Sequence, residues 1–130
     1  MNVSDLPGFD AADALTRIAE LADEDFDALD YGVIAFNGDG IVLRYSAYES
    51  AQTGLDPAEV RGLHVFTSLA QCMNNYLVAQ RFEDSAAAGV PLDETIDYVL
   101  TWRMRPTKVR LRMLARPGLA QRLLLLRHRV

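Results

Sequence analysis

Residues 31–45 read YGVIAFNGDGIVLRY, and this stretch decides the fold. Two runs of apolar, β-branched and aromatic residues flank residues 37–40, which are Asn, Gly, Asp and Gly. These four residues are of the types that readily adopt the positive φ angles of a tight hairpin turn. The pattern therefore predicts a β-hairpin. It does not predict a phosphate-binding loop, because no Gly-Lys-Ser/Thr opens a helix after the glycines.

The segment after the hairpin, residues 46–89, predicts several short helices. Residues 56–59 (Asp-Pro-Ala-Glu) form a capping box with proline in the first turn, and Gly62 ends that helix early. A longer helix is expected from about Asn74 to Ala88, with Gly89 just beyond its end. The side chains expected to face partly inward on it are Tyr76, Leu77, Ala79, Gln80 and Phe82.

The last forty residues predict three antiparallel strands. Residues 95–102 form the first, and residues 108–114 alternate basic with apolar side chains, so one face of that strand is expected to be exposed. A turn at residues 116–118 leads to residues 123–130, whose leucine run predicts a central strand buried on both faces. A hairpin, short helices and three strands together predict an α+β fold with a five-stranded antiparallel sheet.

Residues 1–30 predict a helical cap in front of this fold. Asp10 is expected to cap a helix that the acidic run at residues 23–25 closes. Leu15, Ile18, Ala19 and Ala22 share one face of that helix, and Phe26 and Leu29 are expected to dock on the body.

The chain has 130 residues, half of them apolar, which predicts a single globular domain over 1–130 with a cap (1–30) and a core (31–130). No apolar run approaches the roughly 20 residues that span a bilayer, and the first residues lack the pattern of a signal peptide. With a single cysteine, these features predict a cytoplasmic location and no membrane partner.

The net charge of −5 is unevenly distributed along the chain. Residues 1–60 carry 13 acidic and 2 basic side chains, whereas residues 61–130 carry 5 and 11. We expect the acidic N-terminal segment to lie against a basic sheet. Nucleic acid is not an expected partner, because the total charge is acidic and no base-stacking motif accompanies the basic residues.

Cys72 is the only cysteine, so it has no disulfide partner within the chain. Upstream, Tyr45 and Glu49 place a phenol and a carboxyl four residues apart. A thiol that faces a pocket lined by such groups can hold a small molecule covalently, although a buried structural thiol is the ordinary alternative. Glu49 has an alternative role too, since Ser46-Ala47-Tyr48-Glu49 has the pattern of a capping box.

The two histidines, His64 and His128, are too few for a metal site in the absence of partner cysteines or close carboxylates. His64 with Cys72 would suggest a thiol hydrolase, but the sequence offers no third group to orient the pair. Haem ligation by one histidine stays open, and no motif supports it.

The order of elements is that of a PAS domain, and short motifs from Tyr31 onward resemble the photoactive yellow protein family of bacterial blue-light receptors. The shared residues include Tyr31-Gly32-Val33-Ile34, Gly38-Asp39-Gly40, Leu43-Arg44-Tyr45, Glu49, Thr53-Gly54, Asp56-Pro57, Gly62, Phe66, Ala70, Cys72, Met104, Pro106-Thr107-Lys108-Val109 and Arg129-Val130.

The resemblance implies a p-coumaric acid (4-hydroxycinnamic acid) chromophore, bound as a thioester to Cys72. Its phenolate would be held by Tyr45 and Glu49, with Thr53 behind them. The resemblance also places Ile34, Phe66, Leu69 and Ala70 at the pocket wall and Met104 where a methionine assists recovery of the ground state. It implies a light sensor rather than an enzyme, a monomer or weak dimer that acts on a downstream signalling protein.

Several positions depart from the family pattern. Leu55 stands where an arginine covers the chromophore, Gln71 replaces a proline, Leu100 replaces an aromatic residue, and Trp102 replaces a tyrosine. Arg103 or Arg105 is a candidate replacement for the missing guanidinium. The alternative interpretation is a PAS interaction module with no chromophore or another ligand, in which side chains fill the pocket and the basic sheet binds a partner.

The residue types suit a buried phenolate. A phenol has a pKa of about 10, so an ionised one inside a protein needs strong hydrogen-bond donors. Tyr45 can donate, and Glu49 can donate only while protonated, a state that an apolar pocket favours. If residues 45–49 form a helical turn, both groups share one face. Loss of the Glu49 proton would leave a buried, unpaired carboxylate, at a cost of several kcal/mol that we expect to loosen the N-terminal cap.

Overall fold

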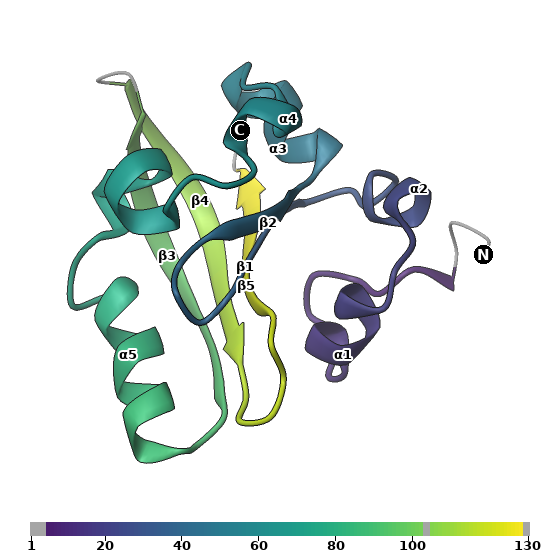
Figure 1. Ribbon diagram of the computed structural model, residues 1–130. Helices are drawn as coiled ribbons and strands as arrows, with labels where there is room; N and C mark the ends of the chain where they lie inside the picture. The colour runs from purple at the N-terminus through teal and green to yellow at the C-terminus, as the bar shows by residue number, and fades with distance from the viewer. Residues whose placement is uncertain (1–4, 103–104, 129–130) are drawn as a thin grey trace.

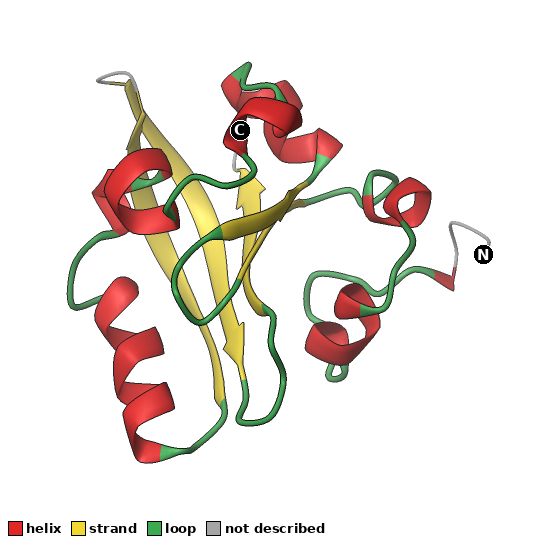
Figure 2. Ribbon diagram, viewed as in Figure 1, coloured by secondary structure: helices red, strands yellow, loops and turns green. Residues whose placement is uncertain are grey.

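A computed structural model describes residues 5–102 and 105–128. Its centre is a five-stranded antiparallel sheet in the order β2-β1-β5-β4-β3. The strands are β1 (Gly32–Phe36), β2 (Val42–Tyr45), β3 (Leu92–Trp102), β4 (Arg105–Ala115) and β5 (Arg122–His128). Figure 1 and Figure 2 show helices on both sides of this sheet, so the α+β prediction with five antiparallel strands is confirmed.

The predicted hairpin is the β1–β2 pair, and its turn is built as the sequence suggests. The Asn37 side-chain oxygen accepts hydrogen bonds from the backbone N–H groups of Asp39 and Ile41, both at 3.0 Å. Gly40 has φ of 81°, a conformation that disfavours residues with a Cβ. The pair ends at Tyr45, which faces Ile34 across the hairpin.

The leucine run of β5 lies in the middle of the sheet, between β1 and β4. Leu123, Leu124, Leu125 and Leu126 are all buried, two on each face. Period-two alternation cannot appear in a strand that is covered on both sides, because both faces need apolar residues. The predicted central, two-sided position of this strand is confirmed.

One face of the sheet is covered by the helical segment between β2 and β3. Its helices are α3 (Ala47–Thr53), α4 (Pro57–Val60) and α5 (Ala79–Ala88), joined by a π-helical turn, η2 (Val65–Leu69), and a 3-10 turn, η3 (Gln71–Met73). The aromatic centre of this layer is Phe36, whose ring meets Phe66 and Phe82 edge-on at 5.5 and 5.0 Å. This layer also contains the cavity described below.

The opposite face is covered by residues 5–30, which include α1 (Ala14–Ala19) and α2 (Asp23–Phe26). Phe9, Ile18 and Phe26 are buried there against the outer side chains of β1, β4 and β5. The prediction of one helix capped by Asp10 is wrong, because residues 8–11 form a turn and α1 begins at Ala14. The acidic run at 23–25 opens α2 instead of closing α1, and it favours a helix N-terminus electrostatically.

The cap changes the exposure of β4. Arg112, expected on a solvent-exposed face, is only 5% exposed because residues 5–30 lie over it. Its guanidinium donates to the backbone oxygens of Phe9 and Ala11 at 2.8 Å, and to both carboxylate oxygens of Asp93 on β3 at 2.8 Å. The exposed alternation therefore holds only for the first part of the strand, at Lys108 and Arg110.

The long helix begins later than predicted, at Ala79 rather than near residue 74. The Asn75 side chain accepts from the backbone N–H groups of Leu77 and Val78, which stabilises a turn in place of a first helical turn. Tyr76 and Gln80 are consequently exposed, whereas Phe82 is buried as expected. Gly89 ends the helix in the left-handed conformation, as predicted.

Candidate functional site

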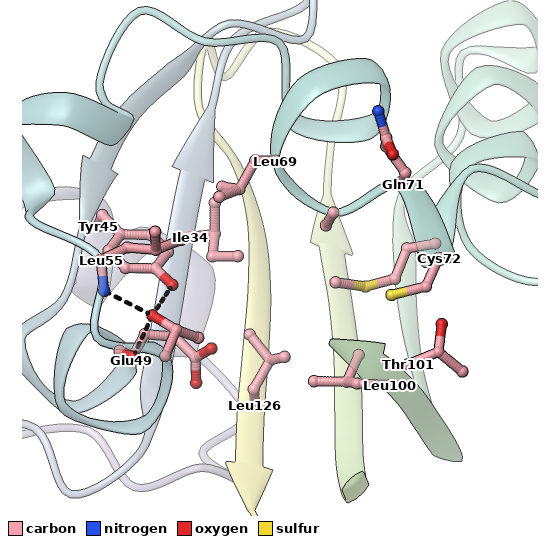
Figure 3. A pocket seen from close by; sticks show the side chains of 13 residues that line it. Ile34, Tyr45, Glu49, Leu55, Leu69, Gln71, Cys72, Leu100, Thr101 and Leu126 are labelled. Atoms are coloured by element: carbon pink, nitrogen blue, oxygen red, sulfur yellow. Dashed lines mark hydrogen bonds between the residues drawn. The ribbon is translucent and has the colours of Figure 1, made fainter. Parts of the chain in front are cut away.

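A cavity of about 300 Å³ lies between the sheet and the segment that runs from α3 to η3. Figure 3 shows Tyr45 and Glu49 on one side of it and Cys72 on the other. Its wall is largely aliphatic, with a few polar groups at the two ends, which is the usual composition of a small-molecule site. The lining residues are Ile34, Tyr45, Glu49, Thr53, Leu55, Leu69, Ala70, Gln71, Cys72, Met73, Leu100, Thr101 and Leu126.

The phenol end of the cavity is organised around Thr53. The Tyr45 hydroxyl and Thr53 Oγ1 are 2.9 Å apart, and Thr53 also donates to the Glu49 carbonyl oxygen at 3.0 Å (Figure 3). Burial raises the pKa of Tyr45, opposed by the Thr53 hydrogen bond and reinforced by the Glu49 carboxyl group. The hydroxyl of Tyr45 therefore keeps its proton. It donates that proton to Thr53 Oγ1, because the Thr53 proton goes to the Glu49 carbonyl oxygen.

Tyr45 and Glu49 do not share a helical turn, as the four-residue spacing had suggested. Tyr45 is the last residue of β2, and Ser46 caps α3, which begins at Ala47. The Ser46 hydroxyl oxygen accepts from the backbone N–H of Val33 at 2.9 Å and from that of Glu49 at 3.5 Å. The two groups nevertheless line one cavity, because the strand end and the first helical turn both face it.

The Glu49 side chain is almost fully buried and has a specific partner. Its Oε1 lies 2.6 Å from Nε2 of His128, at the end of β5. The Glu49 carboxyl group has room only because residue 32 is glycine, since a Cβ on Gly32 would lie 2.2 Å from Glu49 Oε1. Glu49 is thus not the reciprocal member of a capping box, and its carboxyl group is not unpaired.

The thiol end is carried by η3, where Cys72 is a free, half-buried cysteine. The Cys72 carbonyl oxygen accepts from the Tyr98 hydroxyl of β3 at 2.6 Å and from the Asn75 side chain at 3.1 Å. Asn75 also donates to the Tyr98 hydroxyl oxygen at 2.7 Å. This closed network fixes the backbone of the cysteine against the sheet.

His64 supports the same segment from its other end. Its Nδ1 accepts from the backbone N–H groups of Phe66 and Thr67, both at 3.2 Å, and so caps the π-helical turn η2. This engagement with the backbone gives the histidine a structural role and argues against a thiol–imidazole pair with Cys72. Among residues 5–102 and 105–128 there is also no cluster of His, Cys, Asp and Glu suited to a metal ion.

The structure brings most of the predicted site residues together. Those that line the cavity are Ile34, Tyr45, Glu49, Thr53, Leu69, Ala70 and Cys72. Phe66 does not line it; its ring packs against Phe36 and Phe82 in the core instead. Met104 lies outside the described residues. Three departures from the family pattern, Leu55, Gln71 and Leu100, are themselves part of the wall.

The site also contains residues that the sequence analysis did not predict. Leu126 and Met73 complete the apolar wall, and Asn75 and Tyr98 hold the backbone of Cys72. The partner of Glu49, His128, is 79 residues away in the chain. Only the pairing of β5 with β1, which sets Leu126 opposite Gly32, brings this histidine near α3. No helix in the described part of the chain is long and apolar enough to cross a bilayer.

Comparisons with known proteins agree with this geometry, although no protein-family model matches the chain. The photoactive yellow protein of Halochromatium salexigens is 34% identical over 105 residues, 81% of this chain and 83% of that protein. The photoactive yellow protein of Rhodothalassium salexigens is 32% identical over the same shares.

Solved structures give the same result. The photoactive yellow protein domain of the sensor histidine kinase Ppr from Rhodospirillum centenum has a TM-score of 0.78 and 33% identity, covering 85% of this chain and 96% of that one. A PAS domain from Colwellia psychrerythraea has a TM-score of 0.64 at 10% identity over 82% of this chain and 92% of that one, and shows the fold alone. The chain has a PAS fold and belongs to the photoactive yellow protein family.

Proposed function

We propose that this protein is a blue-light photoreceptor that carries p-coumaric acid as a thioester on Cys72. The observation that carries the proposal is the cavity, which has a free thiol at one end and a phenol with a buried carboxyl group at the other. A PAS module that used this region only for packing would fill the space with side chains. In this protein the space stays open, and the cavity volume of about 300 Å³ is suited to a small aromatic ligand.

The residues present fit such a group. Cys72 is the only nucleophile of its kind in the chain, and its backbone is fixed by Tyr98 and Asn75. When bound, the chromophore would supply light absorption and a double bond that isomerises. The aliphatic wall, including Leu69 and Leu126, would exclude water from it.

Tyr45 and Glu49 would hold the phenolate of the chromophore. Tyr45 has the raised pKa of a buried phenol and so donates rather than ionises. Glu49 would donate through the carboxyl oxygen that His128 does not engage. Charge-assisted O–H···O⁻ bonds of this type are roughly twice as strong as neutral ones, which favours an ionised ligand even in an apolar cavity. With the ligand bound, Thr53 would turn its proton from the Glu49 carbonyl oxygen to the Tyr45 oxygen, which would free the Tyr45 proton for the phenolate.

The site is connected to the N-terminal cap through β2 and α3. The Asp27 carboxylate, just after α2, accepts from the backbone N–H of Ala47, two residues before Glu49. Arg44, next to Tyr45, donates to the backbone oxygens of Ile18 and Leu21. We propose that a change of charge at Glu49 shifts α3, weakens these contacts and changes the surface presented to a downstream signalling protein.

Acylation of the purified protein tests the proposal. Incubation with p-coumaric anhydride should add about 146 Da, because acyl transfer to a thiol leaves the coumaroyl group and removes one proton. The product should be yellow and should bleach reversibly under blue light. A Cys72→Ala variant is the matched control and should neither gain mass nor turn yellow.

Two results would contradict the photoreceptor proposal. The first is acylation at Cys72 without visible absorption, which would mean that the cavity does not stabilise the phenolate. The second is no acylation of the folded protein although the unfolded chain reacts, which favours the alternative of a PAS interaction module without this chromophore. A Glu49→Gln variant whose absorption maximum equals that of the wild type would remove Glu49 from the proposed site.

A further inference from the structure

Glu49 and His128 form a buried acid–imidazole pair beside the cavity. The Oε1–Nε2 distance is 2.6 Å, and the side chains are 3% and 10% exposed. The carboxyl group also lines the cavity, so it has one side toward the ligand space and one side toward the histidine. A carboxyl group with two oxygens can accept a hydrogen bond on one of them and carry a proton on the other.

The surroundings of the pair contain few other charges. On α3 the ring of Tyr48 lies 5.9 Å from the imidazole, and on β2 the Tyr45 hydroxyl is turned toward Thr53. On β4 the residue opposite His128 is Val109, which is apolar and buried. Successive strand residues point to opposite faces, so Arg110 and Arg127 belong to the other side of the sheet, where Arg127 lies over the Phe9 ring.

Among the described residues, Glu49 is the acidic residue within 4 Å of the imidazole. Asp30 precedes β1 and falls opposite His128 when the β1–β5 register is extended, but its side chain is exposed to solvent. No described cation other than the imidazole itself is placed to neutralise the carboxylate.

We propose that His128 is the proton-exchange partner of Glu49. While Glu49 is protonated on the oxygen that faces the cavity, neutral His128 donates its Nε2–H to Oε1. When that proton leaves for an acceptor oxygen in the cavity, His128 binds a proton from water at Nδ1 and becomes an imidazolium. The O–H bond of Glu49 breaks, an O–H bond forms on the acceptor and an N–H bond forms at Nδ1. The net change is one proton taken up from solvent.

This inference rests on the proposed function for the identity of the acceptor, which would be the phenolate oxygen, but the pair itself does not depend on it. Its consequence differs from that expected from the sequence, because the carboxylate left behind is neutralised by a positive charge in direct contact. A neutralised carboxylate destabilises its surroundings less than an isolated one. His128 is thus a positioning residue that limits how far the structure opens.

The pair can be tested without any chromophore. In the ¹⁵N-labelled protein, a hydrogen-bonded Nε2 proton of His128 should give a low-field resonance. Glu49→Leu should move it upfield, because the Nε2 proton then loses its acceptor on α3. His128→Gln should abolish it. The exposed acid Glu59 gives the matched control, since Glu59→Leu should leave the resonance unchanged. His64 serves as an internal reference in every spectrum.

The second experiment uses the acylated protein in weakly buffered solution with a pH indicator. A light pulse should cause uptake of about one proton per molecule in the wild type, following the exchange described above. In His128→Gln the uptake should be lost, while the mass gain and the light-induced bleaching remain. His128→Asn, which has a shorter side chain, should also lose proton uptake, because it too lacks a group that can bind a proton.

The outcomes separate this inference from the proposed function. If the protein does not acquire colour, the photoreceptor proposal fails while the low-field resonance still decides whether the pair exists. A resonance that is absent, or that Glu49→Leu leaves in place, overturns the pair. A coloured His128→Gln variant that takes up as many protons as the wild type overturns the exchange role.

Discussion

The two faces of the sheet differ in how they are filled. The face under α3 and α5 keeps a cavity of about 300 Å³, and its polar groups, Tyr45, Glu49 and His128, bond to one another or to Thr53. The face under residues 5–30 is packed by apolar side chains such as Phe9 and Ile18. Its main polar attachments run from arginine side chains to backbone oxygens of the cap.

The polar contacts on the cap side show how residues 5–30 are held on the sheet. Arg112 and Arg44 hold the cap mostly through carbonyl oxygens, so the acidic side chains of residues 5–30 contribute less than the charge asymmetry had suggested. Asp23, paired with Arg44 at 3.6 Å, is itself largely exposed. Separation of the cap would expose its apolar side chains, such as Phe9 and Ile18, but these belong to a different core from the side chains packed between the sheet and α5.

The largest effects are expected for leucines on opposite faces of β5. Leu124 and Leu125 are both fully buried, the first in the cavity-side core and the second under the cap. Truncation of either to alanine should lower the free energy of unfolding by about 4 kcal/mol, through lost transfer energy and a new cavity. Urea unfolding followed by circular dichroism measures this loss.

The two variants should differ in where the native state opens. Leu125→Ala should speed amide hydrogen exchange within residues 5–30, because those residues lose a contact with the sheet. Leu124→Ala should leave exchange in the cap near the wild-type rate. If both variants affect the cap equally, the packing of the two faces is coupled through the sheet.

A somewhat smaller effect is expected when the cap loses its arginine anchor. Arg112→Ala removes a buried cation that binds two cap carbonyls and both oxygens of Asp93. We expect destabilisation of about 3 kcal/mol, because the buried carbonyl oxygens lose their donor. Arg110→Ala is the control on the same strand. Arg110 is exposed and lies 3.9 Å from Asp97, a surface pair for which a loss below about 1 kcal/mol is typical.

Thermal unfolding of the two arginine variants, with limited proteolysis of residues 5–30, distinguishes them. Rapid cleavage in the cap is expected for Arg112→Ala alone. Equal stability of the two variants would mean that the apolar contacts of Phe9 and Ile18, rather than Arg112, hold the cap.

The sequence predicted the sheet well, because its signals are local. The turn at residues 37–40 and the leucine run of β5 each depend on residues adjacent in the chain. The burial of Arg112 depends on a segment a hundred residues earlier, so the alternation on β4 wrongly indicated an exposed face. Likewise the start of α5 was set by one side chain, Asn75, which competes with the helix for backbone donors.

The sequence predicted individual residues of the candidate site but not the contacts between them. Resemblance supplied Cys72, Tyr45 and Glu49, and the fold brings them to one cavity. Phe66 belongs to the core instead, because its ring completes the aromatic cluster around Phe36. The contact between Glu49 and His128 joins two segments with no local signal for each other, and it required the strand register of β5.

An intermediate effect is expected at Gly32, which makes room for the Glu49 carboxyl group. In Gly32→Ala the new Cβ would lie 2.2 Å from Oε1, so Glu49 must move away from His128. Overpacking of this kind typically costs about 2 kcal/mol. Gly38→Ala is the control, because its nearest neighbour would be at 3.7 Å, an ordinary contact. Urea unfolding measures the loss, and the low-field His128 resonance should disappear only in Gly32→Ala.

The smallest effect is expected for a buried phenol on the cap side, Tyr31, which donates to the Pro7 carbonyl oxygen at 2.6 Å. Tyr31→Phe keeps the ring and should lower the free energy of unfolding by about 1 kcal/mol at neutral pH, the net value of one hydrogen bond. Urea titrations of this variant and of Tyr76→Phe provide the measurement. Tyr76 is 77% exposed, and its loss of a hydroxyl should have no measurable effect.

The same phenol predicts a pH dependence that locates the cap contact. Burial raises the pKa of Tyr31 to about 12, against about 10 in the unfolded chain. Between these values the folded state binds more protons than the unfolded state, so this contribution to stability is complete below pH 10 and is lost as the pH rises toward 12. Tyr31→Phe should therefore lose less stability than the wild type over that interval. Parallel pH profiles would instead mean that Tyr31 ionises as an exposed phenol does and that residues 5–30 do not cover it in solution.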